Sequence, residues 1–136
     1  MMRHVYRCPV RWSDMDAFGH VNNVRFLTFL EEARVDLLFT LGRQSGAGEM
    51  AEGVVVARHE IDYLKPLDWT PEGVDVDMWV SRIGAGSFDV SYDIRGGDLV
   101  YARARSVLVP FDLAAGRPRR LTAAERALLE SYRGGS

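Results

Sequence analysis

The chain has 136 residues, of which 47% are hydrophobic and 26% are charged, the composition of an ordinary globular domain. Its formal net charge of -2 argues against a general nucleic-acid binder, which carries a strong basic excess. Cys8 is the only cysteine, which excludes an intramolecular disulfide and a cysteine-based zinc site. The sequence shows no apolar leader and no run of about 18 apolar residues, so we expect one cytoplasmic domain over residues 1–136 with no membrane partner.

The N-terminal part of the chain predicts one strand followed by one long helix. Residues 3–12 alternate apolar and polar side chains as a half-buried strand does, and Pro9 indicates a sheet edge or a bulge. Residues 22–41 carry apolar side chains at helical spacing, without an internal glycine or proline, which predicts a long helix. Its ends carry suitable capping residues, Asn22 or Asn23 at the start and Gly42 after the end.

The rest of the chain predicts an antiparallel sheet. A glycine-rich segment, residues 43–53, reads as a mobile loop. After it, apolar alternation predicts strands over residues 54–64, 74–80, 87–95 and 99–109. Glycines at 84–86 and 96–97 can supply the positive-φ residues of tight hairpins, and short hairpins make neighbouring strands antiparallel.

A short final helix is predicted at about residues 122–132, because Thr122 and Glu125 have the spacing of a capping box. Together these elements predict an α+β fold in which one curved, five-stranded antiparallel sheet wraps around one long central α-helix. The edges of such a sheet need cover, and pairing them in a homodimer would provide it.

Residues 14–23, DMDAFGHVNN, form the densest cluster of reactive and hydrogen-bonding side chains in the sequence. By spacing alone, Asp14 and Asp16 could be metal ligands, an acid/base pair or solvated loop residues. The helix that follows presents unpaired amides and its positive dipole end to a developing negative charge. A carboxylate beside such amides can hydrolyse an acyl group. Ser13, in contrast, lacks the flanking glycines of a nucleophile elbow.

The stretch RWSDMDAFGHVNNVRFLTFLEEAR, residues 11–34, resembles the signature of hotdog-fold acyl-CoA thioesterases of the 4-hydroxybenzoyl-CoA thioesterase type. HEIDYLKPL, residues 59–67, is similar to the second strand of that family, and VPFDLAAGRPRRLTAAE, residues 109–125, resembles its last strand and tail. The resemblance implies a single hotdog domain that hydrolyses acyl-CoA to free acid and CoA, without a metal or a cofactor.

The resemblance also implies roles for individual residues. The catalytic aspartate of the family falls on Asp16, acting either as general base on water or as nucleophile through a mixed anhydride. Helix-start amides would hold the oxyanion, which points to the segment Gly19, His20, Val21, Asn22 and Asn23. Phe26 stands where many members carry tyrosine. As contacts to the substrate we expect Phe26, Arg58, Tyr63 and Lys65.

Members of the family form their sites at a dimer interface, so the resemblance implies a homodimer, or a homotetramer built from two dimers. Two other activities remain open from the sequence. One is hydrolysis of thioesters on acyl-carrier protein, and the other is acyl-CoA binding without turnover. The acyl group itself, aliphatic or aromatic, short or long, cannot be predicted from these motifs.

Overall fold

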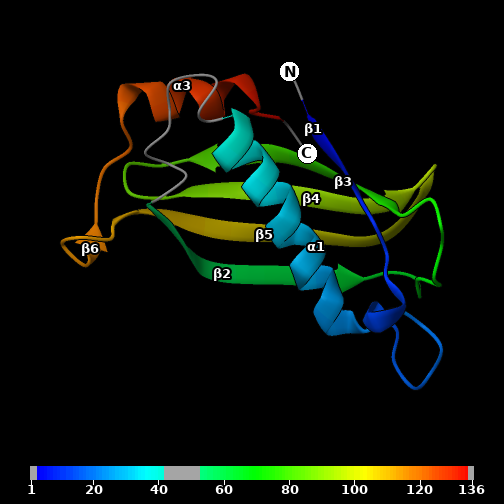
Figure 1. Ribbon diagram of the computed structural model, residues 1–136. Coiled ribbons are helices and arrows are strands. Elements are labelled where there is room, and N and C mark those ends of the chain that lie inside the picture. The colour runs from blue at the N-terminus through cyan, green and yellow to red at the C-terminus, as the bar shows by residue number, and fades with distance from the viewer. Residues whose placement is uncertain (1–2, 42–52, 135–136) are drawn as a thin grey trace.

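The computed structural model describes residues 3–41 and 53–134. Their central feature is an antiparallel sheet with the strand order β1-β3-β4-β5-β2, to whose strand β5 the short β6 is added (Figure 1). The strands are β1 (His4–Cys8), β2 (Val54–Tyr63), β3 (Val74–Ile83), β4 (Phe88–Gly96), β5 (Leu99–Asp112) and β6 (Arg117–Pro118). The predicted five strands are therefore present, and β6 is a sixth that the sequence did not indicate.

The main helix is shorter than predicted. The α-helix α1 spans Asn23–Val35, and the chain continues as a π-helix, Asp36–Leu41, so the predicted helix over residues 22–41 is regular only in its first part. Two consecutive leucines of this π-helix, Leu37 and Leu38, are buried in the core. Asn22 is the cap, since its side-chain oxygen accepts from the Val24 amide at 2.9 Å.

Two further helical segments complete the fold. A 3-10 turn, Trp12–Asp14, follows β1, which ends just before Pro9. The C-terminal helix α3 spans Ala123–Ser131 and has the predicted capping box of Thr122 and Glu125. The predicted helix end at Gly42 and the loop at 43–53, apart from Gly53, lie outside the described residues. No helix in the described part of the chain has both the length and the apolar character needed to cross a membrane.

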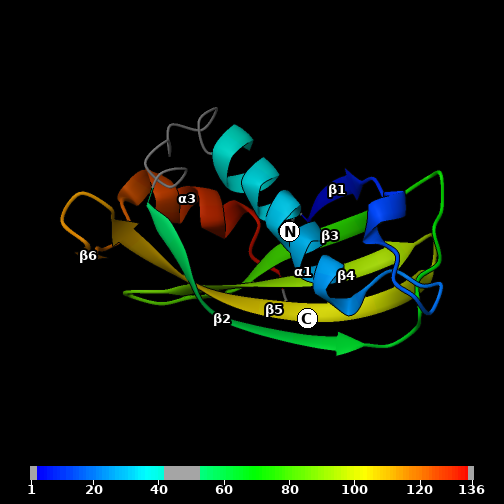
Figure 2. The same ribbon diagram turned by 60° about the horizontal axis from the view of Figure 1, so that its bottom comes forward.

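The sheet is curled, and both α1 and α3 lie on its concave face (Figure 2). Alternate side chains of the central strands form the core on that face, as the period-two pattern predicted: Val74, Val76, Met78 and Val80 of β3 and Phe88, Val90, Tyr92 and Ile94 of β4. They pack against the buried face of α1, which is formed by Phe26, Phe29, Leu30 and Ala33.

The hairpin glycines differ in backbone conformation. Gly97 has a φ of +59° in the β4–β5 turn, as predicted. Gly84 and Gly86, in the β3–β4 turn, are not among the positive-φ glycines, which in the described residues are Gly19, Gly73, Gly97 and Gly116. The β3–β4 turn closes instead with a hydrogen bond from the Gly84 amide to the Ser87 carbonyl at 2.8 Å.

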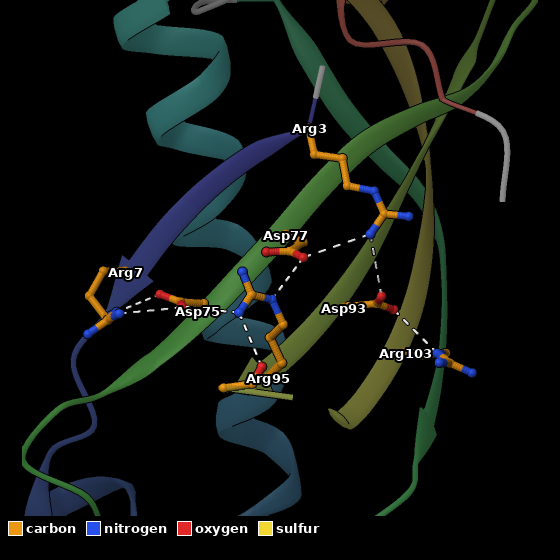
Figure 3. Close-up of polar contacts among 8 residues, drawn as sticks. Arg3, Arg7, Asp75, Asp77, Asp93, Arg95 and Arg103 are labelled. Carbon is orange, nitrogen blue, oxygen red and sulfur yellow. Dashed lines mark hydrogen bonds and ion pairs between the residues drawn. The ribbon is translucent and has the colours of Figure 1, made fainter. Parts of the chain in front are cut away.

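The outer face of the sheet is covered by interleaved arginines and aspartates (Figure 3). Asp93 lies between Arg3, at 3.7 Å, and Arg103, at 3.4 Å. Arg95 donates to Asp77 at 2.9 Å and lies 3.4 Å from Asp75. Each of these arginines therefore has a carboxylate partner within the face itself.

A chain of polar side chains crosses the inner face beneath α1. Arg34 donates to the Tyr92 hydroxyl at 3.2 Å, and that hydroxyl donates to Ser106 Oγ at 3.0 Å. The chain ends at His59, whose Nδ1 lies 2.7 Å from Ser106 Oγ. Partial burial of the imidazole, with the charge of Arg34 as a second cause, lowers the pKa of His59, although the residue as a whole is exposed at the edge strand. The lowered pKa favours the neutral imidazole of His59 in the folded protein.

We predict that His59 makes the stability of the fold depend on pH. A histidine with a lowered folded-state pKa contributes stability that is present above its unfolded pKa of about 6.5 and is lost as pH falls through the folded pKa. The melting temperature of H59Q should therefore fall less than that of the wild type between about pH 7.5 and about pH 5. H20Q, which removes an exposed histidine, is the control, and parallel wild-type and H59Q curves would contradict the assignment.

Candidate functional site

The polar segment between the 3-10 turn and α1 forms a narrow, hydrogen-bonded loop. The Asn22 amide donates to the Asp14 carbonyl at 2.8 Å, and the Asp16 amide donates to the His20 carbonyl at 2.9 Å. Gly19 closes the loop with a φ of +81°, a conformation that glycine adopts without strain. The backbone of the loop is thereby fixed on both sides of Asp16.

The two aspartates of the loop have different surroundings. Asp14 is 0% exposed, and its carboxylate accepts from the Arg11 amide at 2.8 Å and from Arg11 Nη2 at 3.2 Å. Asp16 is only partly buried, and its Oδ1 accepts from the Phe18 amide at 2.9 Å. No other hydrogen bond of the Asp16 carboxylate occurs among the described residues. Asp14 is engaged in the loop, while Asp16 has an oxygen available for chemistry.

Asp16 opens into a cleft of about 400 Å³ at the N-terminal end of α1. The cleft is lined by residues of the loop, of the first turns of α1 and of the segment after β2: Asp16, Phe18, His20, Val21, Asn23, Phe26, Tyr63, Leu64, Lys65, Pro66 and Leu67. The two sides are joined by a hydrogen bond from the Val21 amide to the Leu67 carbonyl at 2.8 Å. The lining combines apolar surface with a few polar groups, which is typical of a small-molecule site.

The hydrogen bonds at the start of α1 show which backbone amides are available to donate to a ligand. The amides of Gly19, Val21 and Asn22 donate to protein carbonyls, those of Asp16, Leu67 and Asp14 respectively. Among the described residues, the amides of His20 and Asn23 have no such acceptor. Asn23 is the first residue of α1 and lines the cleft, so its N–H combines a free donor with the positive end of the helix dipole.

Tyr63 forms a wall of the cleft and contacts α1 directly. Its hydroxyl donates to the Asn23 carbonyl at 3.0 Å, and its ring meets the Phe26 ring edge-on at a centroid distance of 5.3 Å. Phe26 itself has no hydroxyl. Tyr63 therefore provides the aromatic hydroxyl of this wall from the opposite strand.

Most of the residues predicted from the sequence meet in this cleft, and three do not line it. Gly19 shapes the loop, Asn22 caps α1, and Arg58 lies on the exposed face of β2, where it pairs with Glu60. His20 lies at the rim, with Nε2 3.5 Å from Asp68 Oδ1. The sequence reasoning missed Phe18, Leu64, Pro66 and Leu67, although the apolar LKPL run that follows Tyr63 was a readable signal for three of them.

The family resemblance implies a site without a metal, and this stays a prediction. In the described part of the chain no three His, Cys, Asp or Glu side chains are grouped so that they could hold a metal ion. The carboxylate that would be the first candidate ligand, Asp14, is already engaged by Arg11.

The curled antiparallel sheet with α1 on its concave face is a hotdog fold (Figure 2). The family model of the thioesterase-like superfamily matches residues 10–129, and the chain belongs to that superfamily. Among solved structures, the predicted thioesterase from Bacillus stearothermophilus superposes with a TM-score of 0.85 at 26% identity, covering 99% of each chain.

Two further proteins are similar in sequence. The thioesterase from Thermus thermophilus complexed with coenzyme A and Zn is 30% identical, with a TM-score of 0.80, and the match covers 97% of this chain and 95% of that one. The uncharacterized protein YsmA of Bacillus subtilis (strain 168) is 30% identical over 86 residues, which are 63% of this chain and 56% of that protein. The match thus spans little more than half of the length of YsmA.

We predict that Asp14 is required for stability and not for the reaction itself. D14A leaves the Arg11 amide without its acceptor and removes the partner of two arginines, so it should lower the free energy of unfolding by about 1–3 kcal/mol. Chemical denaturation of D14A, with D16A as the matched control at the half-exposed aspartate, measures this difference. Equal stability of the two variants would contradict the role of Asp14.

Proposed function

We propose that the protein is an acyl-CoA thioesterase with Asp16 as its catalytic carboxylate. The proposal is carried by one observation: Asp16 and Asn23 line the same cleft at the start of α1, and the Asn23 amide has no protein acceptor among the described residues. Membership in the thioesterase-like superfamily supports thioester hydrolysis as the reaction. The relative from Thermus thermophilus that is complexed with coenzyme A supports a CoA thioester as the substrate.

In the proposed reaction, the thioester oxygen accepts a hydrogen bond from the Asn23 amide, which stabilises the negative charge that develops on it. Asp16 faces the carbonyl carbon and has two ways to act on it. As general base, it takes a proton from a water molecule that attacks the carbon. As nucleophile, it attacks directly, expels the thiolate of CoA and forms a mixed anhydride that water then hydrolyses. Both routes release free acid and CoA.

We further propose that the active form is a homodimer, alone or within a tetramer. In the described sheet, β2 pairs only with β5, so its outer edge is open over ten residues. His59 and Tyr63 on the inner face of β2 are exposed in the single chain. An open, partly apolar edge of this length is one that proteins cover by pairing with another chain.

Replacing Asp16 by asparagine should lower kcat by roughly 10²- to 10⁴-fold, because the amide neither takes a proton at neutral pH nor attacks a carbonyl. The measurement is thiol release from short, medium, long and aryl acyl-CoAs. The melting temperature should stay close to that of the wild type, since Asp16 is half-exposed. Full turnover by D16N would rule out this mechanism, and binding without turnover by the wild type would favour a non-catalytic acyl-CoA-binding module.

A second pair of variants tests the oxyanion donor. Proline is favoured at the first position of a helix, and Asn22 already has the extended backbone that a following proline requires, so N23P removes the free N–H without breaking α1. N23P should lower kcat by roughly 10²- to 10³-fold. N23A keeps the N–H and should retain kcat within a few-fold. Similar rates for the two variants would mean that another group stabilises the oxyanion.

A further inference from the structure

Beside the cleft lies an aromatic surface that the proposed reaction does not use. The rings of Trp12 and Trp69 are stacked, with centroids 4.8 Å apart and planes inclined by 8°. Trp12 is nevertheless 73% exposed, so Trp69 covers one face of its indole while the other lies open to solvent. A tryptophan this exposed in a rigid stack is unusual for a purely structural residue, because it leaves a large apolar surface in water.

The stacked pair adjoins the cleft through both of its chain segments. Trp12 precedes Asp16 by four residues, which limits the distance between their Cα atoms to about 14 Å. Trp69 follows Leu67, a lining residue whose carbonyl is bonded to the Val21 amide, by two residues. A ligand with its reactive end at Asp16 can therefore extend toward Trp12.

Two arginines near Trp12 share one carboxylate. Arg11 Nη2 lies 3.2 Å and Arg25 Nε lies 3.8 Å from the same oxygen of Asp14, which is itself fully buried. The two arginine side chains remain 57% and 45% exposed. Within the described residues no other carboxylate forms an ion pair with either guanidinium. Glu32 also acts on Arg11 electrostatically, but Asp14 is the carboxylate within ion-pair distance of both guanidinium groups, and they share one of its oxygens.

The arginines on the outer face of the sheet differ in this respect. Arg82, Arg103 and Arg105 have carboxylate partners in Asp89, Asp93 and Glu60. An added phosphate would have to compete with these carboxylates for the same guanidinium groups. Arg11 and Arg25, in contrast, have donors that Asp14 does not occupy, and arginine is suited to phosphate oxygens.

We propose that Trp12, Arg11 and Arg25 bind the nucleotide end of the CoA substrate. The base stacks on the open face of Trp12, and the two guanidinium groups bind phosphate oxygens. Stacking on an aromatic side chain and arginine contacts to phosphate are the two interactions by which proteins hold a phosphorylated nucleoside. The inference rests on the proposed function for the identity of the ligand, and it gives this surface a reason to select CoA over an acyl-carrier protein.

The direct test uses adenosine 3′,5′-bisphosphate, the nucleotide of CoA without its pantetheine arm. Calorimetric titration of the wild-type protein should show binding, and W12L and R25Q should each weaken it about tenfold or more. W12F, which keeps an aromatic face, should restore most of the affinity. R103Q is the matched control, since it removes one arginine charge from the outer face. No binding by the wild type, or equal loss in R103Q, would overturn the proposal.

Kinetics gives a second readout. The ratio of kcat/KM for an acyl-CoA to kcat/KM for the N-acetylcysteamine thioester of the same acid should fall about tenfold or more in W12L and R25Q, through KM. An equal fall for both substrates, or dissociation of an oligomer in W12L measured by light scattering, would identify Trp12 as a protein contact and overturn the proposal. D16N separates this inference from the proposed function, because it should lose turnover and still bind the bisphosphate.

Discussion

The loop that carries the site depends on the buried carboxylate of Asp14. The carboxylate oxygens accept from the backbone and side chain of Arg11. The backbone carbonyl of Asp14 accepts from the Asn22 amide at the start of α1. One residue thus connects the end of the 3-10 turn to the cap of the helix. Asp16 lies between Asp14 and Asn22, and the first amides of α1 follow Asn22 directly. The bond between Asp14 and Asn22 therefore fixes where Asp16 lies and where the first helical amides point.

Much of the fold could be predicted because its elements have simple periods. Alternate apolar residues on β3 and β4 predicted which side chains enter the core, and the capping-box spacing predicted α3. The end of α1 could not be predicted, because the same apolar stripe fits an α-helix or a π-helix. The spacing of apolar residues does not reveal which carbonyl each amide of Asp36–Leu41 bonds.

The site was predicted in part, for reasons that differ between residues. Dipole and capping arguments indicated a site in the loop before the helix, since they apply to any helix start, and the family resemblance selected Asp16 rather than Asp14. Arg58 was proposed as a substrate contact, yet it is an odd number of residues from Tyr63 on the same strand and so faces the other side of the sheet. Phe18 lies in the cleft through a tertiary contact between two loops, and no local pattern reveals that.

The peptide group between Asn22 and Asn23 has a consequence for the strength of the proposed oxyanion contact. Its carbonyl, that of Asn22, accepts from the Arg25 amide at 2.9 Å, while its N–H, that of Asn23, has no acceptor in the described part of the chain. A peptide unit that accepts at one end becomes a better donor at the other, because hydrogen bonds along a chain polarise one another by about 10–30% per bond. An oxygen arriving at Asn23 would meet a dipole that the first turn of the helix has already strengthened.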